Sequence, residues 1–498
     1  MKNHTGLFLS IIAFAVFMSQ CNNHSSNLDI EVYETSESGN QLKNISEFSS
    51  LNNPVSITIN PDEKFQTITG FGGSFTEASA TLLNRLSKEN RNKILEAYFG
   101  ESGARYSLTR THISSCDFSL NNYTYAPVKD DTSLMHFSIK EDMDDIVPMI
   151  KDAMAISKDG FKIIASPWTA PPWMKNNNDW RGGKLLPKYN DTWALFFSKY
   201  LAAYKTEGIN IWGITVENEP MGCGDNWESM IYTPQEMNDF VKKHLGPKLK
   251  ADGHPVKILG FDQNRDALNQ WVDGMYDDAE AKEIYDGTAI HWYASTYDYF
   301  PKELQYARQK APGKHIIQTE ACIDAQVPEW KNDKWYWSKE ATDWGWDWAT
   351  PETKYLHPKY APVHRYAGDI IGCLNNWVDG WIDWNMVLNK QGGPNWFKNW
   401  CVAPVIVDEE KDEVYFTPLY YTMSHFSKFI RPGAVKIGCE ISDTKIMTTA
   451  VKNPDGTIVL VLFNPTDKEI SVEIILNNKK SSISIQANAL QTAVIKSS

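Results

Sequence analysis

The chain has 498 residues, of which 42% are hydrophobic and 22% are charged, and these fractions are those of an ordinary globular protein. The formal net charge is -13 and no run of Lys and Arg is present, which argues against nucleic acid as a partner because phosphate binding needs a basic surface. The length allows a large core and more than one domain.

The first 21 residues have the pattern of an export signal. Lys2 is followed by the apolar run LFLSIIAFAVFM (7–18) and then by Cys21 and a polar linker. About a dozen apolar residues are too few to span a bilayer and are typical of a signal-peptide core. The stretch resembles a bacterial lipoprotein signal, although Gln20 departs from the usual small residue. We therefore expect a lipoprotein-type signal over 1–21, export to the periplasm or cell surface, and an outer-membrane lipid anchor on Cys21.

The remaining polar motifs favour neither metal nor serine-nucleophile chemistry. The other six cysteines form no CxxC pair, and neither an HExxH motif nor a GxSxG motif occurs. We expect no cofactor and buried thiols; an oxidising compartment allows a disulfide, but no spacing locates one. The acids of KEDMDD (140–145) are interpreted as a solvated helix start. The oligomeric state is left open.

Between residues 65 and 414 short apolar strands alternate with longer amphipathic helices. The predicted strands are QTITGFGG (66–73), ARYSLTRTHI (104–113), FKIIASP (161–167), INIWGITV (209–216), VKILGF (256–261), GTAIHWY (287–293), KHIIQTE (314–320) and DGWIDWNM (379–386). Repeated strand and helix units of this kind predict an α/β fold, a (β/α)8 TIM barrel, in preference to a doubly wound sheet.

After residue 414 the pattern becomes that of an all-β unit. The predicted strands are VKIGCEI (435–441), KIMTTAVKN (445–453), TIVLVLFNP (457–465), EISVEIIL (469–476) and the final segment SISIQANALQTAVIKS (482–497). The early strands LDIEVYETSES (28–38) and PVSITINP (54–61) have no core of their own. We expect them to pair with the C-terminal unit, which gives a discontinuous β-sandwich from 22–64 and 415–498 around a barrel of 65–414.

Barrel enzymes carry their chemistry at the carboxyl ends of the strands. The residues at these ends are Asp117, Trp168, Glu217, Glu219, His291, Trp292, Tyr293, Glu320, Asp383 and Trp384. The acids at the carboxyl ends of the predicted strands 209–216 and 314–320 would face each other across the barrel. A carboxyl pair separated by the width of a sugar is what cleavage of a glycosidic bond needs, and aromatic rings offer flat faces to sugars.

Seven motifs in a fixed order carry a family resemblance. GFGGSFTEA, SSCDFSLNNYTYA, ASPWTAPPWMK, TVENEP, HWY, TEA and GWIDWNMVLNKQGGPNW occur in sequence, and the match continues through SHFSKFI (424–430) and over both sandwich segments. The chain closely resembles glycoside hydrolase family 30, the family of lysosomal glucosylceramidase.

The resemblance implies a retaining double displacement. It makes Glu219 the general acid/base and Glu320 the nucleophile, with carboxyl groups about 5–5.5 Å apart. Asn218 would bind the sugar 2-hydroxyl. The other implied sugar-binding residues are Asp117, Trp168, Tyr293, Trp384 and Asn399, and the supporting residues are Arg110 and His291.

Several local expectations follow for the two glutamates. Pro220 should hold Glu219 in an extended backbone. Burial and the negative charge of Glu320 should raise the pKa of Glu219. Glu217 is interpreted as a structural residue paired within the barrel, with the role of proton donor as the alternative.

The substrate is left open by the sequence. The resemblance implies a β-glucoside or β-glucan oligosaccharide, and export favours β-1,6-glucan over glucosylceramide. β-Xylan or another β-glycoside of the same family is an alternative. A carbohydrate-binding lipoprotein without catalysis is a further alternative, which the presence of both Glu219 and Glu320 disfavours.

Overall fold

The structure is a computed structural model that describes residue 1 and residues 28–50, 52–224, 226–295, 297–324 and 361–496. The expected signal and Cys21 lie outside the described residues. Within the described ranges no helix combines the length and the apolar character that a bilayer crossing requires.

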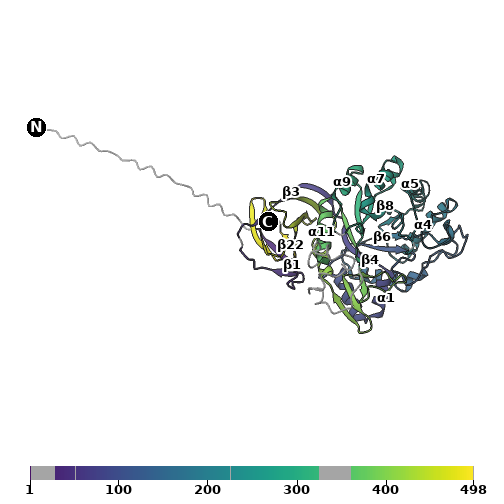
Figure 1. Ribbon diagram of the computed structural model, residues 1–498, viewed down its shortest axis with the longest axis horizontal. Coiled ribbons are helices and arrows are strands. Elements are labelled where there is room, and N and C mark those ends of the chain that lie inside the picture. The colour runs from purple at the N-terminus through teal and green to yellow at the C-terminus, as the bar shows by residue number, and fades with distance from the viewer. Residues whose placement is uncertain (2–27, 51, 225, 296, 325–360, 497–498) are drawn as a thin grey trace, which may run out of the picture.

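Eight parallel strands close into a barrel, which lies to one side of the molecule in Figure 1. They are β4 (Gly70–Phe75), β5 (Leu108–Ile113), β6 (Lys162–Pro167), β7 (Gly213–Thr215), β8 (Lys257–Asn264), β9 (Gly287–His291), β10 (His315–Glu320) and β12 (Gly380–Asn385). All eight predicted strands are confirmed. A Cβ atom on Gly72 would lie 2.0 Å from the Leu108 carbonyl oxygen, so glycine is what lets β4 approach β5 this closely.

Helices surround the barrel and follow most of its strands. They are α1 (Glu77–Arg85), α2 (Lys88–Phe99), α3 (Ile146–Ile156), α4 (Asn190–Thr206), α5 (Pro234–Phe240), α6 (Gly246–Ala251), α7 (Leu268–Tyr276), α8 (Ala279–Ile284), α9 (Pro301–Lys310), α11 (Ala361–Asn375) and α12 (Pro418–Ser427). Inside the barrel, Leu108, Ile164, Leu259, Ala289, Ile317 and Ile382 form a buried apolar cluster. The lumen is therefore a packed core, and a binding site has to lie at the strand ends.

The segment KEDMDD is only partly the solvated helix start that its charges suggest. Asp142 is fully buried and accepts hydrogen bonds from the hydroxyls of Tyr123 (3.0 Å), Tyr125 (2.5 Å) and Tyr204 (2.6 Å). Burial raises the pKa of Asp142 to about 7, against the effect of these hydrogen bonds. The tyrosine hydroxyls come from distant segments, so a local charge pattern could not reveal this site.

The second domain is a sheet of nine strands that encloses its own apolar core. Its strands are β1 (Ile30–Ser36), β2 (Lys43–Ile45), β3 (Val55–Thr67), β17 (Val435–Ile441), β18 (Met447–Lys452), β19 (Ile458–Asn464), β20 (Ile470–Leu476), β21 (Lys479–Ile485) and β22 (Ala489–Ile495). The final predicted segment contains the last four residues of β21 and all of β22, because the chain turns between them at Asn488, whose φ is 47°.

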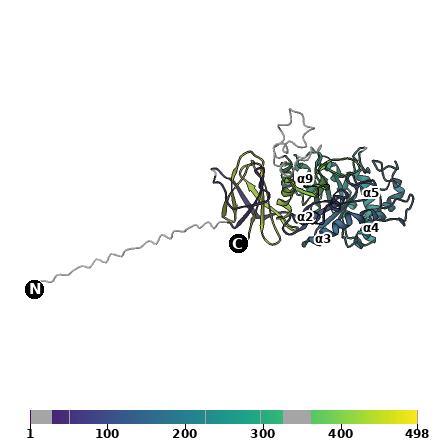
Figure 2. The ribbon, with the colours of Figure 1, turned by 90° about the horizontal axis from the view of Figure 1, so that it is seen from below.

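The two predicted N-terminal strands, which are β1 and β3 in the structure, belong to this sheet, as expected. β1 pairs antiparallel with β22 along its whole length, and β3 lies between β17 and β20. Figure 1 shows the purple N-terminal strands beside the yellow C-terminal ones, and Figure 2 shows the sandwich next to the barrel from a second direction. Helix α12, inside the segment predicted to be all β, contacts β4, β1 and β22 and so joins the two domains.

Two small sheets lie beyond the barrel strands. β11 (Ile323–Asp324) pairs antiparallel with β14 (Cys401–Val402). β13 (Val387–Asn389), β15 (Val405–Asp408) and β16 (Glu413–Phe416) form a three-stranded sheet. They hold the described residues that follow β10 and β12, some of which belong to the candidate site.

Candidate active site

A cavity of about 310 Å3 opens at the carboxyl ends of the barrel strands. All eight residues predicted to be catalytic or sugar-binding line it, namely Asp117, Trp168, Asn218, Glu219, Tyr293, Glu320, Trp384 and Asn399. The two predicted supporting residues, Arg110 and His291, have fully buried side chains directly beneath it. Six of the ten strand-end residues line the cavity, and the other four, Glu217, His291, Trp292 and Asp383, are buried outside its lining. Asn218, Asn399 and Arg110 were implied by the family resemblance.

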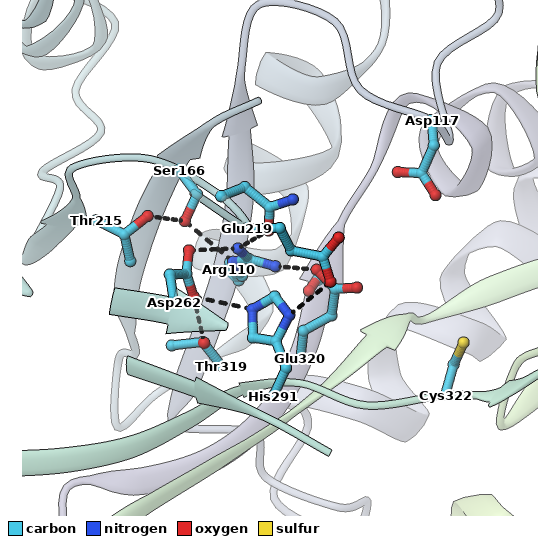
Figure 3. Close-up of polar contacts among 12 residues, drawn as sticks. Arg110, Asp117, Ser166, Thr215, Glu219, Asp262, His291, Thr319, Glu320 and Cys322 are labelled. Carbon is cyan, nitrogen blue, oxygen red and sulfur yellow. Dashed lines mark hydrogen bonds and ion pairs between the residues drawn. The ribbon is translucent and has the colours of Figure 1, made fainter. Parts of the chain in front are cut away.

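Arg110, on β5, binds groups from four other strands or strand ends (Figure 3). Its Nε donates to Ser166 Oγ at 3.0 Å, and Nη2 donates to both Asn218 Oδ1 and Asp262 Oδ2 at 2.8 Å. Its Nη1 forms an ion pair with Glu320 Oε2. A buried guanidinium requires such partners because an uncompensated charge is costly to desolvate.

Glu320 ends β10 and is held by two donors. One carboxyl oxygen binds Arg110, and the other accepts a hydrogen bond of 2.9 Å from the Tyr293 hydroxyl. Burial raises the pKa of Glu320, the positive charges of His291 and Arg110 act against that rise, and the charge of Glu219 adds to it. Arg110, implied as a supporting residue, and Tyr293, implied as a sugar-binding residue, therefore both bind Glu320.

Glu219 lies just beyond β7, and its backbone differs from the prediction. Its φ is 48°, so the residue adopts a left-handed conformation and not the extended one expected before Pro220. The cause is a tight set of backbone hydrogen bonds: Glu219 N–H donates to Asp262 O at 3.0 Å, and Gly222 N–H donates to Glu219 O at 2.7 Å. These hydrogen bonds bend the chain into a turn and fix the position from which the Glu219 side chain extends.

His291 connects the Glu219 carboxyl with Asp262 on β8. Its Nδ1 lies 3.2 Å from Glu219 Oε1 and its Nε2 lies 3.0 Å from Asp262 Oδ1. Burial alone lowers its pKa, but the charges of Glu320 and Asp262 and both hydrogen bonds raise the pKa of His291 to about 9. The ring is therefore an imidazolium at neutral pH, and its two nitrogens donate to Glu219 Oε1 and Asp262 Oδ1.

Asp262 was not selected from the sequence, although it is the centre of this network. It accepts hydrogen bonds from Arg110, His291 and the Thr319 hydroxyl, the last at 2.5 Å. Burial opposes its charge, yet Arg110 and His291 hold the pKa of Asp262 well below its usual value. The strand-end rule could have found this residue, since Asp262 directly follows the predicted strand VKILGF.

Glu217 is buried as predicted, but it forms no ion pair. Neither of its carboxyl oxygens has a hydrogen-bond partner among the described residues. Burial raises the pKa of Glu217 well above its usual value, against the charge of Lys175. The Lys175 ammonium is already bound to Thr169 Oγ1 and to the carbonyls of Trp180 and Ser229.

The cavity wall also has an aromatic and polar part. Trp168 and Trp384 stack with ring centroids 5.2 Å apart and planes 17° apart, and the Arg110 guanidinium lies over both rings. Asp117 accepts a hydrogen bond of 3.1 Å from Asn399 Nδ2. Burial, followed by the charge of Glu320, raises the pKa of Asp117 well above its usual value. Rings beside hydrogen-bonding groups form a surface that fits a sugar.

Glu228 is a second residue that the sequence did not reveal. It accepts hydrogen bonds from Ser115 Oγ (2.8 Å), Asn122 Nδ2 (2.6 Å) and Trp396 Nε1 (3.2 Å). These donors belong to the loops that carry Asp117 and Asn399. Glu228 itself lies in the loop after β7. Its hydrogen-bond donors come from two other loops, so the sequence around Glu228 does not indicate them.

The described residues contain no group of three or more His, Cys, Asp or Glu side chains placed to hold a metal ion. What the cavity offers is a pair of carboxyl groups with different neighbours. Figure 3 shows both carboxyl groups at the edge of the network nearest to Asp117. Such a pair can supply a nucleophile and a proton donor.

The raised pKa of His291 predicts a stability contribution that depends on pH. A folded pKa of about 9 exceeds the usual 6.5, so the contribution is complete below pH 6.5 and is lost as the pH rises through 9. We expect His291→Gln to cost on the order of 3 kcal/mol more at pH 6 than at pH 10. Urea unfolding of both proteins at the two pH values measures this, and an equal cost at both would contradict the charged state of His291.

Comparisons with known proteins agree with this geometry. Residues 68–430 match the glycosyl hydrolase family 30 TIM-barrel domain, and residues 433–493 match the glycosyl hydrolase family 30 beta sandwich domain. Putative glucosylceramidase 3 of Caenorhabditis elegans is 34% identical over 95% of this chain and 90% of its own length.

Two further similar proteins are named for two different activities. Lysosomal acid glucosylceramidase of Mus musculus is 33% identical over 84% of this chain and 79% of its own length. The solved structure of the endo-beta1,6-glucanase BT3312 superposes with a TM-score of 0.81 at 28% identity, over 94% of this chain and all of that one. The chain is a glycosyl hydrolase and belongs to glycoside hydrolase family 30.

Proposed function

We propose that the protein is a retaining glycosidase that cleaves β-glucosidic bonds through Glu320 and Glu219. The observation that carries the proposal is the unequal environment of two glutamates in one cavity. Glu320 is held by the cation Arg110 and by Tyr293, and Glu219 is held only by His291 among the described residues. The first arrangement suits an ionised nucleophile, and the second leaves one oxygen of Glu219 available to a leaving group.

In the first step a Glu320 oxygen attacks the anomeric carbon and Glu219 gives its proton to the leaving glycosidic oxygen. The bond to the leaving group breaks as the bond between sugar and Glu320 forms. Arg110 and Tyr293 keep the attacking carboxylate in place. The imidazolium of His291 orients the Glu219 carboxyl from below.

In the second step water replaces the leaving group. Glu219, now ionised, takes a proton from that water, whose oxygen attacks the anomeric carbon and releases Glu320. The contact with His291 holds the Glu219 carboxyl in place during this step. Two inversions at the same carbon leave the β configuration unchanged.

The remaining cavity residues are proposed to bind the sugar on the glycone side. Arg110 occupies the amide oxygen of Asn218, so the amide can offer its N–H donors to the sugar 2-hydroxyl. Asp117 and Asn399 are placed for further hydroxyls, and Trp168 and Trp384 for the apolar ring face.

The favoured substrate is β-1,6-glucan. Around Glu219 the cavity is lined by Asn226, Trp227, Gln263 and Asn264, which are amides and a ring and therefore suit a sugar as the leaving group. The similarity to an endo-beta1,6-glucanase structure supports the same choice. Export with a lipid anchor on Cys21 remains part of the proposal, since a surface enzyme would meet such polymers.

Glucosylceramide is the second candidate. It is supported by the identity of 33% to mouse lysosomal acid glucosylceramidase over 84% of this chain. The two substrates share a β-glucosyl group and differ in the leaving group. Their discrimination therefore depends on the loops that surround Glu219.

Removal of the Glu228 side chain should weaken substrate binding and spare the chemical step. Glu228→Ala removes an acceptor from Ser115, Asn122 and Trp396, which loosens the loops that carry Asp117 and Asn399. Ser115 and Trp396 keep their contacts with the carbonyls of Tyr123 and Cys116. We expect KM to rise about tenfold with kcat within about threefold, since one hydrogen bond to a charged group is worth about 1.5–3 kcal/mol. Steady-state kinetics measure both constants, and the exposed Asp239→Ala is the control.

The central test is a chromatographic product profile from linear β-1,6-glucan. Glu320→Gln should lower the rate more than about a thousandfold, because the amide cannot act as nucleophile. Glu219→Gln should lose about 100- to 10,000-fold on glucan and much less on an aryl β-glucoside whose leaving group needs no proton. Glu217→Gln is the matched control and should behave alike on both substrates.

The products distinguish the candidates. Gentio-oligosaccharides absent from the Glu320→Gln digest would identify an endo-acting β-1,6-glucanase, and glucose alone would identify an exo-acting enzyme. No release from glucan, with hydrolysis of glucosylceramide, would reject the favoured substrate. No hydrolysis of glucan, glucosylceramide or aryl β-glucosides by the folded protein would reject the proposed function.

A further inference from the structure

Two cysteines meet in the wall of the cavity. The sulfur atoms of Cys322 and Cys401 lie 2.9 Å apart, and both residues line the cavity beside Glu320 and Asn399. Cys322 directly precedes β11, and Cys401 begins β14. β11 and β14 pair antiparallel with Asp324 opposite Cys401, so Cys322 lies two residues from the position that faces Cys401.

The other four described cysteines have different surroundings. The sulfur of Cys373 lies 3.4 Å from Asp369 Oδ2 and that of Cys223 lies 3.5 Å from Trp227 O. The sulfurs of Cys116 and Cys439 contact the hydroxyls of Ser119 and Thr448. Among the described residues, therefore, Cys322 and Cys401 are the pair whose sulfurs approach each other.

We propose that Cys322 and Cys401 form a thiol–disulfide exchange site that closes a disulfide across the cavity wall. The oxidant is a small disulfide, RSSR, which reaches the sulfurs through the cavity. One thiolate attacks RSSR and releases RSH after protonation, and the second thiolate then displaces the remaining RS group. Overall, two thiols and RSSR give one disulfide and two RSH, so electrons and protons balance. A bond length of about 2.05 Å requires the sulfurs to close by less than about 1 Å.

The cross-link would join the two halves of the site. Cys322 stands two residues after Glu320, and its sulfur lies 3.6 Å from the Tyr293 hydroxyl that binds this glutamate. Cys401 stands two residues after Asn399, which binds Asp117. Figure 3 shows the Cys322 sulfur on the side of the site where the Asp117 and Glu320 carboxyls lie. The disulfide would therefore fix the nucleophile relative to the sugar-binding wall.

Peptide mapping of the whole chain tests the proposal directly. Purified protein is incubated with oxidised glutathione or with dithiothreitol, alkylated in denaturant and cleaved with trypsin. Cys322 and Cys401 fall in separate tryptic peptides, 315–331 and 399–411, each with a single cysteine. We expect the two peptides to be linked after oxidation and to appear separately, both alkylated, after reduction. Cys373 is the internal control and should be alkylated in both samples.

Thermal unfolding gives a second measurement. The two cysteines are 79 residues apart in the sequence, so the disulfide should strongly reduce the conformational entropy of the unfolded chain. We expect the oxidised protein to unfold on the order of 5 °C above the reduced protein, and Cys401→Ala to unfold at one temperature in both conditions. If that variant does not fold, the peptide map of the unaltered chain decides alone.

Two outcomes would overturn the proposal. One is alkylation of both cysteines after oxidation. The other is glutathione on either cysteine without a linked peptide, because the partner sulfur would then have failed to displace it. These measurements do not require activity, so the inference stands or falls independently of the proposed substrate.

Discussion

The buried guanidinium of Arg110 is the interaction on which the active site depends. A cation with a fully buried side chain is tolerated only when anions and hydrogen-bond acceptors surround it. Here the acceptors are Ser166, Asn218, Asp262 and Glu320, which come from four different strands or strand ends. The contacts that neutralise this one charge therefore fix Glu320, the proposed nucleophile, Asn218, beside the proposed acid/base, and Asp262, which binds His291. The same cation lies over Trp168 and Trp384, so it also supports the aromatic wall.

The burial of Arg110 also accounts for the different surroundings of Glu320 and Glu219. Glu320 contacts Arg110 itself, whereas Glu219 is connected to it only through His291 and Asp262. Asp262 also accepts the hydroxyl of Thr319, the residue before Glu320, so one aspartate links both glutamates. Two carboxyl groups in one cavity thus have different electrostatic surroundings, which is the condition for dividing the roles of nucleophile and proton donor. The proposed disulfide would add a covalent link on the other side of Glu320.

Much of this arrangement could be predicted because it repeats along the chain. Most barrel strands are short apolar runs followed by a helix, so all eight strands could be predicted. The strand ends supplied six of the predicted cavity residues, and the family resemblance supplied Asn218 and Asn399. The features that were missed depend on partners far apart in sequence. Asp142 is buried by tyrosines of distant segments, and Glu228 is bound by two other loops. The left-handed turn at Glu219 results from a hydrogen bond to Asp262, which outweighs the preference that Pro220 imposes. The contact between the sulfurs of Cys322 and Cys401 lies beside the pairing of two very short strands, β11 and β14, which the sequence did not indicate.

The most direct test of the division of roles is to trap the glycosyl-enzyme. A 2-deoxy-2-fluoro-β-glucoside with a good leaving group slows hydrolysis of the intermediate, so the sugar stays on the residue that attacked it. We predict one fluoroglucosyl group per chain, located by peptide mass spectrometry on Glu320, and no label on Glu320→Gln. A label on Glu217 or Glu219, or rapid turnover of aryl β-glucosides without any covalent label, would contradict the account.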